Sequence, residues 1–245
     1  MTGDTHKAGG MLCAVAGFLL LKQQGLLLSN VNELVQLGVL YPFAMWGSTL
    51  PDTDHDWSSC PNKGVPNYLI NKLLHITTPV YRRLDETLPS HLKRGLGFRL
   101  AKLLSANHRS WQTHSDLTLV AVIYLLFKVM SGGIGTGAVD SVDTAIITLM
   151  LAGVGMGVVA HFVLDMLTPQ GIWFTFGVLV NKLAKRHILP VKLRVVPSSP
   201  LFSTGSNWEM LVCKLVKIAT VVAVAIFLLT YISPDLLANY SISIK

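Results

Sequence analysis

The chain has 245 residues, of which 51% are hydrophobic and only 13% are charged. Soluble globular domains carry about 25% charged residues, so this composition excludes an ordinary soluble domain and indicates an integral membrane protein. The net charge of +7 is typical of a membrane protein whose basic residues gather on one side of the bilayer, and it does not favour nucleic-acid binding. Three distant cysteines predict neither a disulfide framework nor a paired-cysteine zinc site.

Five apolar stretches predict an all-α, polytopic membrane protein with about five transmembrane helices. They are Gly10–Leu28, Leu34–Leu50, Leu117–Met130, Val142–Leu164 and Leu211–Ile232. The third stretch has the length of a span only if residues 111–116 continue its helix. In the fourth stretch, Gly153 and Gly157 lie one helical turn apart, which predicts a face of small residues for close helix packing.

The segments between these stretches predict helices at the membrane surface. Residues 52–116 are too many for a bare loop, and both Asn67–Leu84 and Ser90–Leu104 have the spacing of amphipathic helices. In Ser90–Leu104, leucines at helical spacing are surrounded by basic residues, as in a helix on an anionic membrane. A solvated face of an ordinary packed helix gives the same pattern. Ile172–Val180 is too short to span and is predicted to be interfacial or re-entrant.

The positions of lysine and arginine predict how the chain crosses the membrane. If five spans alternate, 17 of the 20 Lys and Arg residues lie on the side of the N-terminus or at the mouth of the last span on that side. Basic residues accumulate on the cytoplasmic side, so the N-terminus is predicted in the cytoplasm and the C-terminus on the opposite side of a bacterial inner membrane. We interpret residues 1–245 as one domain, with a motif core in residues 1–175 and with a basic linker and last transmembrane helix in residues 176–235.

Possible metal ligands gather in four patches at the ends of apolar stretches. His6 precedes the first stretch, and Asp52-Thr53-Asp54-His55-Asp56 follows the second. A patch from His108 to Asp116 precedes the third stretch, and His161 and Asp165 end the fourth. Alternating spans bring all four patches to the predicted cytoplasmic side. Unpaired charges at a bilayer edge cost on the order of several kcal/mol each, and a divalent cation is a natural partner for mixed Asp and His.

Spacing separates favoured ligands from ligands in reserve. His161 and Asp165 are at i and i+4 and face one side of a helix, whereas the spacing of His108 and His114 does not fit one helical face. The favoured metal ligands are His6, Asp52, His114, His161 and Asp165, with Asp54, His55 and His108 in reserve. A catalytic zinc takes about three protein ligands, so the larger set predicts two ions, Zn²⁺ first with Mn²⁺ or Fe²⁺ as alternatives. The remaining histidines, in amphipathic or basic segments, are predicted at the surface: His75, His91 and His187.

At these residues the chain resembles the YdjM-like family, described as LexA-regulated, membrane-bound metal-dependent hydrolases of bacteria. The matching pieces are His6, Leu50-Pro51-Asp52-Thr53-Asp54-His55, His108-Arg109-x-x-x-Thr113-His114-Ser115 and His161-x-x-x-Asp165-x-x-Thr168-Pro169-x-Gly171. That family is similar, more remotely, to zinc-dependent phospholipase C and the P1-type nucleases, which are all-helical enzymes that cleave phosphodiesters with a cluster of zinc ions. The resemblance implies a phospholipase C/P1 nuclease-like helical core and hydrolysis of phosphate esters.

The leading hypothesis is a membrane-bound metal-dependent hydrolase that cleaves a phospholipid or other amphiphilic phosphoester with a metal-activated water at the cytoplasmic leaflet. In this hypothesis Asp54 or His55 relays a proton and Arg109 holds the phosphate. In this hypothesis membrane lipid surrounds the protein and also supplies its substrate. Two alternatives stay open at this stage: an ion or metal transporter, with ligands spread through the membrane depth, and a membrane-remodelling protein that keeps a metal only for folding.

Overall fold

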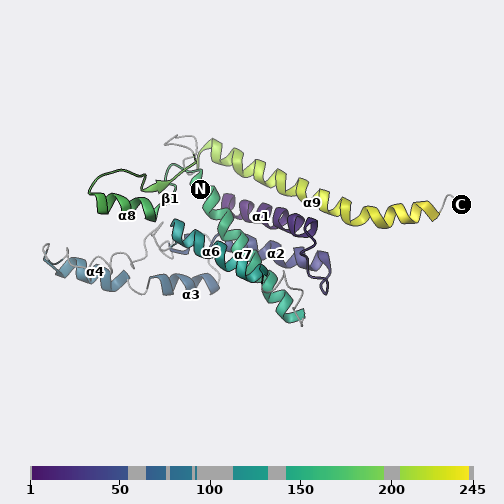
Figure 1. Ribbon diagram of the computed structural model, residues 1–245, viewed down its shortest axis with the longest axis horizontal. Coiled ribbons are helices and arrows are strands. Elements are labelled where there is room, and N and C mark those ends of the chain that lie inside the picture. The colour runs from purple at the N-terminus through teal and green to yellow at the C-terminus, as the bar shows by residue number, and fades with distance from the viewer. Residues whose placement is uncertain are drawn as a thin grey trace.

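The structure, a computed structural model, describes residues 2–54, 65–75, 78–89, 92, 113–131, 142–195 and 205–242, and within them it is mostly helical. The helices of the bundle are α1 (Gly3–Gln23), α2 (Glu33–Gly47), α6 (Asp116–Val129), α7 (Val142–Met166) and α9 (Asn207–Ile242). Helix α9 runs along the outside of the bundle and extends past it (Figure 1).

Smaller elements gather toward the end of the bundle where the N-terminus lies (Figure 1). They are the 3-10 turn η1 (Pro51–Asp54), the helices α3 (Val65–Leu74), α4 (Thr78–Thr87) and α8 (Thr175–Ala184), and the strands β1 (Ile172–Trp173) and β2 (Lys192–Leu193). The two strands pair antiparallel, with Ile172 opposite Leu193. Helix α8 therefore lies between these two paired strands in the sequence.

Small residues let α2 and α7 approach until their backbones touch. A Cβ atom on Gly157 would overlap the Ala44 carbonyl oxygen, and one on Gly47 would overlap the backbone of Val154. The prediction of a small-residue face at Gly153 and Gly157 is therefore confirmed. Because no side chains lie between them at these positions, the two helix backbones come into direct contact.

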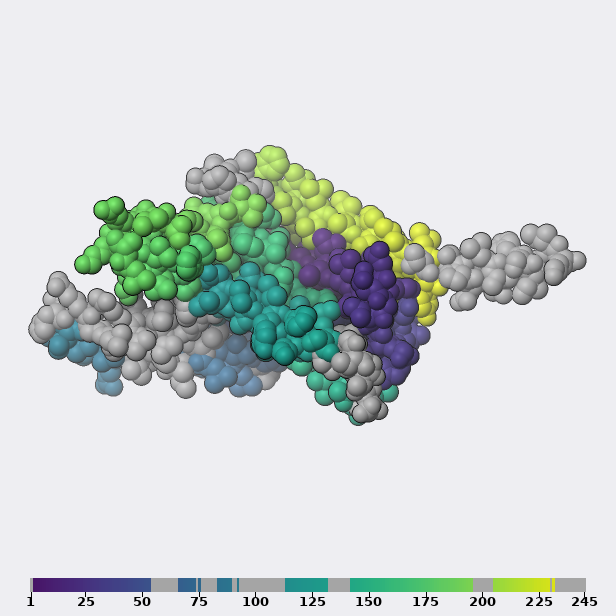
Figure 2. All heavy atoms as spheres, in the orientation of Figure 1, coloured from purple at the N-terminus to yellow at the C-terminus, as the bar shows by residue number. Residues whose placement is uncertain are grey.

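The apolar core lies between α1, α2 and α7, and α9 closes it from outside. Fully buried Phe18 of α1 meets Phe227 of α9 edge to face, with ring centroids 5.1 Å apart. Helix α6 buries none of its residues fully, and only 11% of the apolar stretch of α9 is buried. Figure 2 shows both helices on the surface of the molecule. Their exposed leucines, valines and phenylalanines suit contact with lipid rather than with water.

Polar side chains terminate and connect the helices. Ser115 caps α6 by accepting a hydrogen bond from the Thr118 amide at 3.2 Å, so the helix begins at Asp116. Buried Gln36 donates to the carbonyls of Leu28 and Val31, both at 2.7 Å, and so supports the turn between α1 and α2.

Several predicted boundaries were wrong. Helix α1 begins at Gly3, so it contains His6 instead of following it. Residues 113–115 do not continue α6, because the Ser115 cap starts that helix at Asp116 and leaves it with 14 residues.

Two predicted helices also differ from the observed ones. The segment Asn67–Leu84 holds two helices, α3 and α4, and Pro79 at the start of α4 lacks the amide that a continuous helix needs. The segment Ile172–Val180 divides into β1 and the first half of α8. The predicted helix Ser90–Leu104 lies outside the described residues apart from Leu92.

Two of the described helices are long and apolar enough to cross a membrane, namely Val142–Met166 and Asn207–Leu229. Helices α2 and α6, with 15 and 14 residues, are shorter than the roughly 20 residues of a usual span. The expected Leu34–Leu50 and Leu117–Met130 spans are therefore seen as shorter helices.

The contact between α2 and α7 makes a testable prediction. Gly157→Ala should lower the free energy of unfolding by about 1–3 kcal/mol, because the new methyl group has no room against the backbone of α2. The matched control is Gly38→Ala in α2, where a Cβ meets nothing within 4 Å, so this change should be neutral or stabilise by about 0.5–1 kcal/mol. Unfolding in detergent, followed by circular dichroism, measures both. Equal effects from the two variants would contradict the close contact.

Candidate metal centre

Five ionisable side chains from four separate parts of the chain meet at one end of the bundle. They are His6 in α1, Asp52 in η1, His114 just before α6, and His161 and Asp165 near the end of α7. All five are buried, and Asp52, at 6%, is the most exposed. Helices α1 and α6 begin at this end while α2 and α7 finish there, so the alternation of the chain explains why the four patches meet.

The turn that carries Asp52 is anchored to α3. Asn71 donates from its side-chain amide to the Thr53 carbonyl at 2.5 Å. One helical turn earlier in α3, Asn67 accepts a hydrogen bond from the indole of Trp46 at 2.7 Å. The Asn71 bond therefore holds Thr53, the neighbour of Asp52, against α3, and the Asn67 bond joins α3 to α2.

A backbone carbonyl orients His161. Its Nδ1 lies 2.7 Å from the carbonyl oxygen of Ser48, at the end of α2. A carbonyl only accepts, so Nδ1 carries the proton and the lone pair of Nε2 points into the centre. Metal-ligating histidines in proteins have this arrangement, in which one nitrogen is held by an acceptor and the other binds the ion.

His114 is held from two sides. Its Nδ1 lies 2.9 Å from the Thr113 hydroxyl, and its carbonyl accepts a hydrogen bond from the Trp173 amide of β1 at 2.7 Å. Its Nε2 is 3.3 Å from Nε2 of His161. With the proton of His161 on Nδ1, its Nε2 has no proton to donate, and a cation between the two nitrogens satisfies both.

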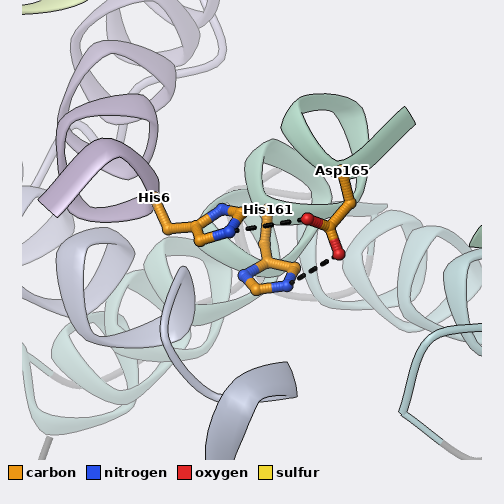
Figure 3. Close-up of side chains that lie close together, drawn as sticks. All are labelled: His6, His161 and Asp165. Atoms are coloured by element: carbon orange, nitrogen blue, oxygen red, sulfur yellow. Dashed lines mark ion pairs between the residues drawn. The ribbon is translucent and has the colours of Figure 1, made fainter. Parts of the chain in front are cut away.

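His6 enters the centre stacked on His161. The two rings are 3.8 Å apart between centroids, with an angle of 18° between their planes (Figure 3). Neither ring nitrogen of His6 has a hydrogen-bond partner among the described residues. A fully buried imidazole without such a partner is costly, and a bound cation removes that cost.

The carboxylates divide their oxygens between the histidines. Asp165 places Oδ1 3.5 Å from Nε2 of His6 and Oδ2 3.5 Å from Nε2 of His161, as the dashed lines in Figure 3 show. Asp52 places Oδ2 3.9 Å from His6 and Oδ1 3.8 Å from His161. Nε2 of His114 lies near the same oxygens as His161, 3.6 Å from Asp52 and 3.5 Å from Asp165.

These distances define two groups of donor atoms. The first, which we call the His6 group, has three donors: Nε2 of His6, Oδ1 of Asp165 and Oδ2 of Asp52. The second, the His114/His161 group, comprises the two Nε2 atoms with Oδ1 of Asp52 and Oδ2 of Asp165, and each of these oxygens lies 3.5–3.8 Å from both nitrogens. Within it, one donor atom each of Asp52, His114 and His161 lie within 4.8 Å of one another. An ion bound by an imidazole nitrogen lies near the plane of that ring. The donor atoms of His6, His161 and Asp165 also lie within 4.8 Å of one another, but nearly parallel rings 3.8 Å apart cannot both direct their lone pairs at one ion unless a ring turns.

The electrostatics of Asp52 suit a ligand. Burial alone would raise the pKa of its carboxyl group, but His161, His114 and His6, when their imidazoles are protonated, outweigh burial and hold that pKa well below its usual range. A metal ion in place of those protons would supply the same positive charge.

All five favoured ligands are among the described residues, and the structure brings all five together. His161 and Asp165 face the same side of α7, as their spacing predicted. His55, His108 and Arg109 lie outside the described residues, and of Asp54 only the backbone, at the end of η1, is described. His187 is exposed, as predicted for a surface histidine, while His75 is half-buried.

Sequence reasoning missed the groups that hold the ligands in place. The Ser48 carbonyl is a backbone group, so no residue type in the sequence indicates that it holds His161. Thr113 is part of the motif that contains His114, but the motif did not indicate that its hydroxyl contacts the ring. Asn71 lies 18 residues after Thr53, and no sequence pattern links the two.

Fold and site together define a class: a helical membrane protein with a buried cluster of histidines and aspartates that could hold a metal ion. Residues 1–239 match the family described as YdjM inner membrane protein, and the chain belongs to that family. No curated protein and no solved structure matches the chain.

The donor set predicts that a divalent cation stabilises the fold. Zn²⁺ at about 1,000 times its Kd should raise the free energy of unfolding by about 4 kcal/mol, because the folded centre binds it and the unfolded chain does not. His161→Ala and Asp165→Ala should abolish this stabilisation, while the exposed control His187→Ala should keep it in full. Thermal unfolding in detergent with and without Zn²⁺ measures the effect. An identical response from all the variants would show that the cation binds elsewhere.

Proposed function

We propose that this protein is a metal-dependent hydrolase that cleaves a phosphoester of a phospholipid or other amphiphilic molecule at the cytoplasmic leaflet of the inner membrane. One observation carries the proposal: among the described residues, the His6 group has three protein donors, one fewer than the four that close a structural zinc site. Structural zinc sites are closed by four protein ligands, and catalytic sites keep an open position.

We further propose that the centre takes two ions, one in each group of donors, with Asp52 and Asp165 shared between them. Each carboxylate has one oxygen nearer His6 and the other nearer His161, which supports two ions rather than one. Mixed imidazole and carboxylate donors favour Zn²⁺, with Mn²⁺ or Fe²⁺ as alternatives. When bound, such ions lower the pKa of a water molecule and polarise a phosphoryl oxygen.

The chain's own residues set up this chemistry in three ways. The Ser48 carbonyl and the Thr113 hydroxyl orient the imidazoles of His161 and His114. Burial of the ligands excludes bulk water and strengthens electrostatic interactions. Asp52 is the most exposed of the five ligands, which supports an approach for substrate from the side of η1. In our proposal Asp54 or His55 relays a proton and Arg109 holds the phosphate.

The membrane topology we propose has five spans, α1, α2, α6, α7 and α9, with the N-terminus and the metal centre in the cytoplasm. Two of these helices meet the length and hydropathy of a span on their own, and the position of lysine and arginine favours this orientation. The ligands lie together at one end of the bundle, which disfavours a transporter with ligands spread along an ion path.

A second candidate function has one observation in its favour. Four of the five ligands are completely buried, as expected if a metal serves only the fold of a membrane-remodelling protein. This candidate predicts metal binding without turnover, so an activity assay separates the two.

The hydrolase proposal predicts activity that depends on both groups of donors. Metal-loaded protein in nanodiscs should cleave a fluorogenic phosphodiester or a phospholipid analogue, and a chelator should abolish the activity. His6→Ala should keep about one ion per chain and lose more than ~100-fold in kcat/KM, because even residues that only support a ligand are worth 10–100-fold. His187→Ala is the control. Turnover by His6→Ala at the normal rate would refute a role for the His6 group, and full metal content without any turnover would favour the structural metal.

The topology predicts the location of the C-terminus. Alkaline phosphatase fused after residue 245 should be active, because the tail lies outside the cytoplasm after five spans, and the same reporter placed between α8 and α9 should be inactive. Reporter assays in intact bacteria measure both. Activity at both positions, or at neither, would contradict the five-span arrangement.

A further inference from the structure

One buried carboxylate joins the last helix of the chain to the start of α1. Glu209, in the first turn of α9, is only 1% exposed. Its Oε1 accepts hydrogen bonds from the Thr2 amide and from the Thr5 hydroxyl, the latter at 3.1 Å, and its Oε2 accepts from the Gly205 amide at 2.6 Å. Glu209 therefore joins residues at the starts of α1 and α9, 207 positions apart in the chain.

This carboxylate lies where two helices present unpaired amides. The Ser206 hydroxyl caps α9 by accepting from the Glu209 amide at 3.2 Å, while the Glu209 side chain turns back to Gly205 in a variant of the capping box. At α1, the N-cap Thr2 makes no capping bond with its own side chain, and Glu209 supplies the acceptor from another helix. Negative charge is stabilised at the positive ends of both helix dipoles.

A short path of hydrogen bonds leads from Glu209 to His6. Glu209 binds the amide of Thr2, and the carbonyl of Thr2 accepts from the amides of Thr5 and His6 at 3.1 and 3.2 Å. The Thr5 hydroxyl also contacts the Thr2 hydroxyl at 3.0 Å. The first turn of α1 is thus held at its backbone and its side chains, and His6 follows directly.

We propose that Glu209 is a positioning residue for His6: it holds the first turn of α1 so that the imidazole stays stacked on His161 with Nε2 toward the carboxylates. His6 needs such support, because no hydrogen bond among the described residues orients its ring. His161 and His114, in contrast, are held by the Ser48 carbonyl and the Thr113 hydroxyl. The predicted effect of Glu209 on metal binding rests on the proposed two-ion centre.

Two readouts test this role, and neither uses activity. The first is Co²⁺ titration by visible absorption, in which Glu209→Ala should weaken binding at the His6 group by about 10–100-fold and leave the His114/His161 group unchanged. The second is NMR of the metal-free protein labelled with ¹⁵N-histidine, in which the His6 ring signals, assigned with His6→Gln, should shift or broaden. Glu209→Gln keeps the shape and one acceptor, so it should recover part of both effects.

The matched control loosens the same pair of helices far from the centre. Phe227→Leu removes the edge-to-face contact with Phe18, so it should lower stability without changing the Co²⁺ titration or the His6 signals. Equal behaviour of Glu209→Ala and Phe227→Leu in both readouts would overturn the proposal. If the unmodified protein binds fewer than two ions, the two-ion centre fails, and the His6 signals in metal-free protein still decide the role of Glu209.

Discussion

Three imidazoles and two carboxylates are buried together at one end of an apolar bundle, and the rest of the structure is arranged around their need for a common counter-charge. Ionised groups in such surroundings are stable only when they are paired, and neither ring nitrogen of His6 has a hydrogen bond among the described residues. The donor atoms lie 3.3–3.9 Å apart, too far for most to bond one another well and close enough to surround small cations. The centre therefore makes physical sense as a metal site.

Close packing of α2 and α7 determines the geometry of this centre. Because Gly47 and Gly157 carry no side chains, the end of α2 approaches α7 until the Ser48 carbonyl reaches Nδ1 of His161. The same approach brings Asp52, four residues further on, beside His161 and Asp165. A contact that stabilises the bundle thus also selects the tautomer and the direction of a ligand, which links the stability of this membrane fold directly to its chemistry.

The outer elements support individual ligands. Helix α3 holds the turn of Asp52 through Asn71, β1 holds His114 through its backbone, and α9 holds the start of α1 through Glu209. Helix α9 would otherwise look like a simple membrane anchor, because most of its surface is exposed. Its contact with α1 gives the C-terminal part of the chain a role in the site, which fits the extent of the YdjM family over nearly the whole sequence.

The sequence by itself determined the membrane class, the helical fold and the five residues that gather at the candidate centre, because these residues stand at those ends of apolar helices that an alternating chain brings together. The spacing of His161 and Asp165 sufficed to place them on one face of α7. Only the tertiary structure decided that each carboxylate divides its oxygens between two sets of histidines, that His6 stacks on His161, and that Glu209 supports His6. Those features depend on distances between helices, which are set by backbone contacts and by partners remote in the chain, and no local pattern of residues encodes them.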